Sequence, residues 1–237
     1  MDSVSFLNRI ICSGITITKD DLNDARILLE EGDSLLPRHL LMLPLYYTWS
    51  SFVVRKLYRL KLYDPFYPSF RLMDSIHQDK RGITVFEHSL RVLNEVDKDT
   101  VGIHQKYLII LKLAALFHDV GKISTMGTVD GKLRFLGHEY ESVSIVEQYV
   151  DAFRLISPQD KKILSNIIKN HMAPLQYQRI PNWTLPAITN FVNKCFNRRY
   201  DIVIKFAEYD KRASTSNEKY IQPLHELLDK CHEVKNV

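Results

Sequence analysis

The residues best suited to chemistry are an adjacent histidine and aspartate, His118 and Asp119, which lie in a mostly apolar segment, Leu113–Lys122. An apolar helix seldom carries both groups without partners, because burying an unpaired polar group costs roughly 2 to 7 kcal/mol. A divalent metal ion binds both imidazole nitrogen and carboxylate oxygen, so it would satisfy the two groups at once. The pair therefore points to a metal site.

Other polar residues recur on the apolar faces of predicted helices. Each lies three or four positions from apolar residues and so shares their face. They are His88, His171 and Asp210. A single inward histidine is usually a core residue with a hydrogen-bond partner, whereas an inward carboxylate needs a paired charge or a metal. Together with the adjacent pair, these residues favour a metal centre.

The donor types indicate the metal and the class of site. Nitrogen and oxygen ligands suit Mn, Fe, Co, Ni or Zn, and Mg is an alternative. The cysteines are far apart, which argues against a structural zinc site and against a disulfide framework, and so indicates a reducing compartment. We also find no basic segment followed by an apolar core near the N-terminus, so we expect a cytoplasmic protein without a signal peptide. An open metal site would activate water at neutral pH.

Helices are expected to position these residues. Thr84 and Glu87 form a capping-box pattern, which starts a helix with His88 in its first turns. A longer helix is expected from about residue 105 to residue 119, with Gly121 as its stop signal. The sequence thus places His88 and the His-Asp pair on two separate helices.

Two later helices carry the remaining candidates. Ser157-Pro158 supplies an N-cap and a first-turn proline for a helix that reaches His171. Another helix, from about residue 200 to residue 213, contains Asp210. Between these regions and the His-Asp pair, Asp130-Gly131 separates two short runs and gives a weak hairpin signal.

The first 66 residues are expected to form an N-terminal helical extension, and residues 67–237 the main domain. The segment 64–68 has the composition of a turn or linker. The least charged stretch, Leu40–Val54, is shorter than the ~20 residues of a membrane span, so it predicts a buried helix and no span, with a helix on a membrane surface as the alternative. The basic, aromatic run Arg55–Tyr63 could stack on bases, but we favour a solvated helix face whose tyrosines pack inward.

The order of the candidates resembles a known pattern. His88, then His118-Asp119, then Asp210 is similar to the H…HD…D pattern of the HD superfamily of metal-dependent phosphohydrolases. Segments around these residues, with 130–139 and 170–172, resemble the HD domain of bacterial CCA-adding (tRNA nucleotidyltransferase) enzymes over roughly residues 67–215. The resemblance implies an all-α HD-domain helical bundle with a small hairpin insertion and an N-terminal helical extension.

The resemblance also implies roles for individual residues. Those matching the first metal site are His88, His118, Asp119 and Asp210. His138 and His171 match the histidines that hold a second ion in two-metal relatives, with Asp119 as the bridge. Lys122 matches the lysine of the HD-x-G-K motif and could bind a phosphate oxygen; alternatively it is a lysine at a helix C-terminus, where the dipole favours it. Asp119 and Lys122 are therefore the catalytic candidates, and we expect one tight metal and a weaker second site.

The activity implied is hydrolysis of a phosphoester of a nucleotide or RNA end, including 2′,3′-cyclic phosphodiesterase and phosphatase reactions. A cyclic mono- or dinucleotide phosphodiesterase, a nucleoside-phosphate phosphohydrolase and a metal-stabilised RNA- or partner-binding module are the alternatives. The N-terminal part is too short for a nucleotidyltransferase head and lacks its Gly-Ser and Asp-x-Asp elements, so nucleotide addition is not expected. No DNA-readout motif is present, and the sequence does not predict an oligomeric state.

Overall fold

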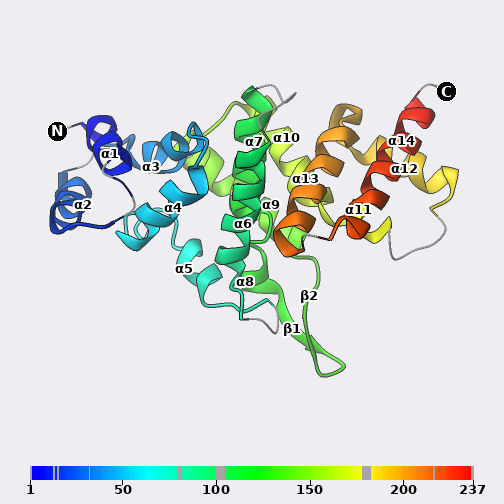
Figure 1. Ribbon diagram of the computed structural model, residues 1–237, viewed down its shortest axis with the longest axis horizontal. Helices are drawn as coiled ribbons and strands as arrows, with labels where there is room; N and C mark the ends of the chain where they lie inside the picture. The colour runs from blue at the N-terminus through cyan, green and yellow to red at the C-terminus, as the bar shows by residue number, and fades with distance from the viewer. Residues whose placement is uncertain are drawn as a thin grey trace.

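The computed structural model describes residues 2–12, 14, 16–31, 33–78, 82–99, 105–177, 183–215 and 217–235. The fold is an all-α bundle with one small hairpin, as predicted (Figure 1). Its N-terminal helices are α1 (Ser3–Cys12), α2 (Lys19–Glu31), α3 (Leu36–Leu45), α4 (Ser50–Arg59) and α5 (Ser69–Asp74). In Figure 1 the two chain ends lie at opposite ends of the molecule, with α7 between them.

The central elements are α6 (Val85–Lys98), α7 (Gln105–Phe117), α8 (Lys122–Thr125), β1 (Met126–Val129), β2 (Lys132–Phe135), α9 (His138–Phe153) and α10 (Pro158–Asn170). The last elements are α11 (Met172–Tyr177), α12 (Leu185–Lys194), the 3₁₀ turn η1 (Phe196–Arg198), α13 (Tyr200–Ser214), the 3₁₀ turn η2 (Glu218–Tyr220) and α14 (Gln222–Lys235). Helix α14 follows the last helix that the sequence analysis predicted. It buries Leu224, Leu227 and Cys231 and packs on α12 and α13.

The predicted caps fix where the helices of the site begin. Thr84 Oγ1 accepts the backbone N–H of Glu87 at 3.1 Å, at the start of α6. Ser157 Oγ accepts the N–H of Asp160 at 3.2 Å, at the start of α10. Each hydroxyl satisfies one of the amide groups that lack a partner in the first turn of a helix. These short-range signals therefore set the ends of two helices that carry site residues.

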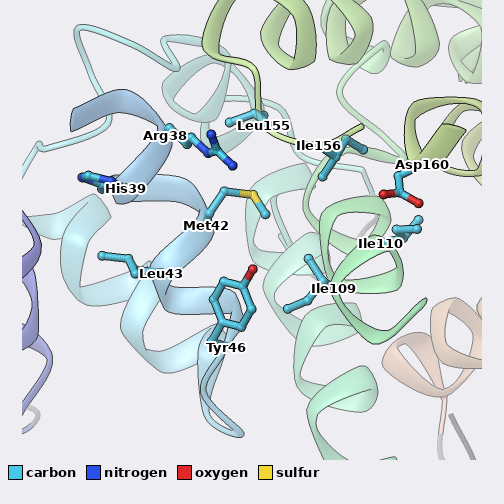
Figure 2. Close-up of a pocket in the computed structure, with 10 residues that line it drawn as sticks. All are labelled: Arg38, His39, Met42, Leu43, Tyr46, Ile109, Ile110, Leu155, Ile156 and Asp160. Atoms are coloured by element: carbon cyan, nitrogen blue, oxygen red, sulfur yellow. The ribbon is translucent and has the colours of Figure 1, made fainter. Parts of the chain in front are cut away.

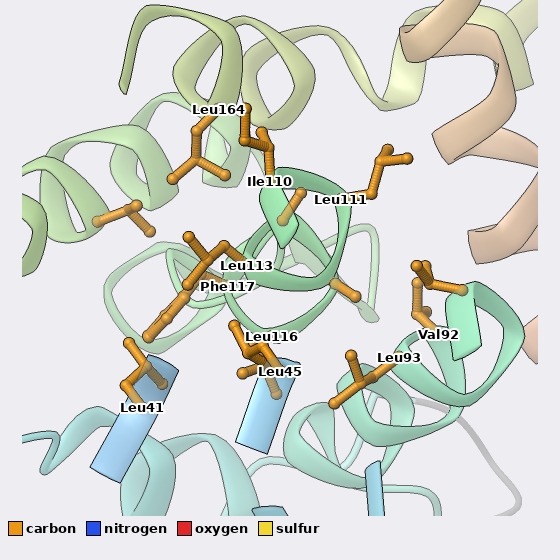
Figure 3. Packing of buried hydrophobic residues seen from close by; sticks show 14 of the residues in the cluster. Leu41, Leu45, Val92, Leu93, Ile110, Leu111, Leu113, Leu116, Phe117 and Leu164 are labelled. Atoms are coloured by element: carbon orange, nitrogen blue, oxygen red, sulfur yellow. The ribbon is translucent and has the colours of Figure 1, made fainter. Parts of the chain in front are cut away.

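Helix α7 is the centre of the core. It is apolar over most of its length, which is typical of a helix surrounded by protein. Figure 3 shows its side chains, Leu113 and Phe117 among them, between α3, α6 and α10. Lys112, also buried, donates from Nζ to the carbonyl oxygens of Leu45 and Tyr47 and pairs with Asp97 at 2.8 Å. The tight packing of α7 thus holds in place the end of the helix, which directly precedes His118 and Asp119.

The end of α7 differs from the prediction. The helix stops at Phe117, and His118–Gly121 form a turn that leads into α8. Gly121 has φ −65° and ψ −13°, so it does not stop the helix by adopting a left-handed conformation. Gly121 thus keeps right-handed backbone angles in this turn. The need for glycine at this position is steric, because the backbone of α9 lies too close for a side chain.

The hairpin matches its weak sequence signal. β1 and β2 pair antiparallel, with Val129 opposite Lys132. Asp130 and Gly131 have φ of 51° and 69°, which is the combination that a two-residue type I′ turn requires. Both strands are largely solvent-exposed, and in Figure 1 the hairpin extends away from the helices.

The N-terminal helices share the hydrophobic core of the rest of the chain, which is continuous from Phe6 to Cys231. The domain boundary at residues 66 and 67 therefore stays a prediction. Within the basic, aromatic run, Lys56 is buried and donates to the carbonyl oxygens of Ile10 and Gly14, and Tyr63 is buried as well. Among the described helices, none has both the length and the hydropathy to cross a bilayer.

Candidate metal centre

Six buried histidine and aspartate side chains converge from five parts of the chain. They are His88 of α6, His118 and Asp119 in the turn after α7, His138 at the start of α9, His171 directly after α10, and Asp210 of α13. The nitrogen and oxygen atoms fall into three overlapping groups, and within each group they lie within 4.8 Å of one another. All the residues predicted to bind metal thus lie in one place; that they bind one stays a prediction.

Asp119 lies at the centre of the cluster. Its Oδ2 is 3.2 Å from His118 Nε2 and 3.9 Å from His88 Nε2. Its Oδ1 is 3.2 Å from His138 Nε2 and 3.9 Å from His171 Nε2. One carboxylate oxygen therefore faces each half of the cluster, the arrangement that a bridging ligand needs.

Asp210, on α13, lies beside His88 of α6 at one side of the cluster. Its Oδ1 lies 2.9 Å from His88 Nε2 and 4.0 Å from His118 Nε2. Helix α13 packs directly against α6, which brings these residues together although 122 positions separate His88 from Asp210. The second carboxylate thus serves the half of the cluster that holds His88 and His118.

The hydrogen bonds of three imidazoles define which nitrogen faces the cluster. In His118, His138 and His171, Nδ1 lies 3.2, 2.8 and 2.7 Å from the carbonyl oxygen of the residue three positions earlier. A carbonyl oxygen only accepts, so Nδ1 carries hydrogen and Nε2 of the neutral ring carries a lone pair.

Those three Nε2 atoms are buried, and none has a hydrogen-bond partner within the described part of the chain. Buried polar atoms without partners are rare in folded proteins. A lone pair beside a carboxylate oxygen is repelled unless a positive charge, either a proton on the ring or a metal ion, lies between them. The donor set therefore fits a divalent metal ion, and metal-binding histidines commonly donate their second ring nitrogen as these do.

The electrostatics of the cluster also favour a cation. Burial would raise the pKa of Asp119, but the charges of His118 and Lys122 outweigh it and hold that pKa well below its usual value. Burial opposes ionisation of Asp210 too, yet its hydrogen bond with His88 keeps its pKa low. Burial, together with the charge of His118, lowers the pKa of His171 to about 4, so that this ring is neutral at pH 7. For His118, burial lowers the pKa and the charge of Asp119 raises it, with a net increase.

Gly121 supports the site in a way that the sequence analysis did not predict. A Cβ atom at this position would lie 2.2 Å from the carbonyl oxygen of His138 and 2.5 Å from the amide nitrogen of Ser142. The Gly121 N–H donates to Ser142 Oγ at 2.8 Å. The first turn of α9 therefore packs directly on the backbone of the turn that carries His118 and Asp119.

Lys122 lies at the edge of the cluster. Its Nζ is 2.7 Å from Asp119 Oδ2 and 3.0 Å from Gln78 Oε1. It is the first residue of α8, so stabilisation by a helix C-terminus does not explain its position. Gln78 was not identified from the sequence, because it belongs to no motif and precedes α6 in an irregular segment.

Two hollows of the molecule differ in their relation to the cluster. The larger one, about 520 Å³, lies between α3, α7 and the α9–α10 connection, and none of the six cluster residues lines it (Figure 2). A smaller one, about 360 Å³, is lined by Glu139 and Asn170, the sequence neighbours of His138 and His171. No cluster residue lines either hollow, but of these two only the smaller one is lined by sequence neighbours of cluster residues.

Comparison with known protein families identifies a match. The family model described as "HD domain" matches residues 85–222, more than half of the chain. All six cluster residues and Lys122 fall within this range. No curated protein matches the chain, so the finer resemblance to CCA-adding enzymes has no support from a relative.

Proposed function

The chain belongs to the HD domain family, and we propose that it hydrolyses a phosphoester of a nucleotide or RNA end with the help of a divalent metal. One observation carries the proposal: three buried imidazole nitrogens without hydrogen-bond partners surround Asp119, within the described residues. A core that needed these histidines only for packing would pair both of their ring nitrogens.

The ligands of the first metal would be His88, His118, Asp119 and Asp210. A second, weaker ion would use His138 and His171, with Asp119 shared between the sites. When bound, such a metal polarises a phosphoryl oxygen and lowers the pKa of water to near neutrality. The candidate metals are Mn, Fe, Co, Ni, Zn and Mg.

The chain's own residues supply orientation and charge. Lys122, whose side chain is 14 % exposed, can leave Asp119 and place its ammonium group against a phosphate oxygen. Gln78, which accepts from the same Nζ, holds the lysine over the cluster until then. A positive group preorganised where negative charge develops lowers the barrier, and burial strengthens the effect.

Turnover of bis-p-nitrophenyl phosphate across these metals tests the reaction class. Elemental analysis of the purified protein, before and after metal titration, tests the metal. Absence of turnover together with tight metal binding would instead favour the RNA- or partner-binding module. Absence of metal under all conditions would reject both.

For the substrate, we propose 2′,3′-cyclic nucleotides ahead of 3′,5′-cyclic ones, on the resemblance to CCA-adding enzymes alone. Product formation from each isomer can be followed by chromatography. A preference for 3′,5′-cyclic nucleotides or cyclic dinucleotides would support a cyclic-nucleotide phosphodiesterase. Release of phosphate from nucleoside phosphates would support a nucleoside-phosphate phosphohydrolase.

A further inference from the structure

The smaller hollow, about 360 Å³, is lined by Glu139 and Asn170, whose sequence neighbours His138 and His171 belong to the cluster. Its volume is within the range of about 300 to 1,000 Å³ that is typical of small-molecule sites. Its walls come from the start of α9, the end of α10, α11 and α12. The residues are Glu139, Tyr140, Lys169, Asn170, Met172, Ala173, Gln176, Trp183, Ala187, Asn190, Phe191 and Lys194. A group attached to a phosphate at the cluster could therefore extend into it.

Aromatic rings form part of these walls. Trp183 packs edge-on against Phe191, with ring centroids 5.7 Å apart, and against Tyr177 at 5.4 Å. Tyr140 is 58 % exposed, and the ammonium of Lys169 lies 5.4 Å from its ring centroid. Proteins that bind single-stranded nucleic acids without sequence preference stack the bases on aromatic rings.

The charges of the hollow suit an anion. Among the described residues, neither Lys169 nor Lys194 makes an ion pair, and both side chains are exposed. The acidic residue of the hollow, Glu139, lies with its Oε2 3.5 Å from Nδ1 of His138. Two cations at the hollow are thus available for phosphate oxygens.

The side-chain amides that line the hollow can form hydrogen bonds with the edge of a base. Asn170 Nδ2 lies 2.9 Å from the carbonyl oxygen of Asn166, which can only accept, so the orientation of this amide is determined. The amide group also meets Asn166 Oδ1 at 3.0 Å, and that oxygen accepts the backbone N–H of Phe196. The orientation of the Asn170 amide is thereby fixed, and Gln176 and Asn190 supply further amides to the same hollow.

We infer that this hollow, the α9–α12 pocket, binds the nucleobase of the substrate while the adjoining phosphate lies at the cluster. The inference rests on the proposed function and deepens it, because it assigns the base of the nucleotide to a particular pocket of the fold. A sugar phosphate would gain little from aromatic walls. An acyl chain would leave the lysines and amides unpaired.

The two tryptophans of the chain allow a direct test. Trp49→Phe leaves Trp183 as the sole tryptophan, so its fluorescence reports on the pocket. AMP, GMP, CMP and UMP are titrated against ribose 5-phosphate on the full-length protein, and chromatography checks that each nucleotide stays intact. We expect at least one nucleotide to change the Trp183 emission and to bind about tenfold or more tightly than ribose 5-phosphate.

Calorimetry on variants supplies the second measurement. Trp183→Leu should weaken binding of that nucleotide about tenfold. Lys194→Ala should weaken it about threefold to fivefold, and remains informative if Trp183→Leu does not fold. Lys162→Ala, which removes an exposed lysine outside the pocket, should have no effect.

The inference is overturned if ribose 5-phosphate binds as tightly as every nucleotide, if binding leaves Trp183 unchanged, or if Lys162→Ala matches Lys194→Ala. Hydrolysis of bis-p-nitrophenyl phosphate, which has no base, is measured separately on the wild-type protein. Failure of that reaction counts against the proposed function, whereas the binding results count only for or against the pocket.

Discussion

The backbone of His138 lies so close to Gly121 that no side chain fits between them: a Cβ on Gly121 would be 2.2 Å from the His138 carbonyl oxygen. The two residues belong to the turn after α7 and to the first turn of α9. Because one turn carries Asp119 and the other begins with His138, the width of this contact sets how far apart the two halves of the cluster lie.

Substitution of Gly121 by alanine should therefore push α9 away and displace His138. We expect a loss of about 1 to 3 kcal/mol in the free energy of unfolding, which is usual for overpacking, and a larger loss of hydrolysis. Urea denaturation and turnover of the reporter measure both. Gly127→Ala is the matched control, since a Cβ there meets nothing within 4 Å. Equal behaviour of the two variants would show that the contact does not matter.

Asp119→Asn should abolish hydrolysis while the protein stays folded, because the amide keeps the shape and loses the charge that faces both halves of the cluster. Lys122→Ala should lower kcat less, by about 10²- to 10³-fold, which is the effect of losing one preorganised charge. Asp151→Asn, in an exposed pair with Lys161, is the control. Wild-type turnover by Asp119→Asn would refute the assigned mechanism.

The double substitution His138→Ala/His171→Ala should leave a tightly held metal on His88, His118, Asp119 and Asp210 and remove most of the activity. Elemental analysis after dialysis gives the metal content, and reporter turnover gives the activity. If the variant loses all its metal, these two histidines belong to the primary site and the division into strong and weak sites is wrong.

Lys112→Met tests the packing behind the site. The change leaves Asp97 buried without its cation and should cost about 3 to 5 kcal/mol of stability. Adding Asp97→Asn should recover part of the loss, because the unpaired charge is then gone. Denaturant midpoints of the single and double variants show this directly. If the double variant is no more stable than Lys112→Met, the charge of Asp97 is not the cause.

Local signals in the sequence predicted the parts of the fold that depend on neighbouring residues. The caps at Thr84 and Ser157 and the turn at Asp130-Gly131 are confirmed because each rests on a hydrogen bond or a backbone angle within a few positions. The inward faces likewise identified His88, His118, His171 and Asp210 as residues that would meet, whereas His138 was identified only by the resemblance. Helical periodicity determines the direction of a side chain whatever the helix packs against.

Contacts between residues far apart in the sequence could not be predicted from such local signals. The stop of α7 at Phe117 and the steric need for Gly121 depend on how closely α9 approaches, which no local pattern encodes. Gln78 reaches Lys122 across 44 positions from an irregular segment. Helix α14 has apolar residues at regular spacing, but its many charged residues obscured the face that α11, α12 and α13 bury.

The carbonyl groups that hold His118, His138 and His171 come from residues only three positions earlier. Each ring is therefore oriented by its own stretch of backbone and not by the ion it would bind. Little rotamer entropy is then lost when a metal enters, so that binding energy is retained as affinity. By the same reasoning, a protein whose metal has been removed with a chelator should bind metal again without having to refold.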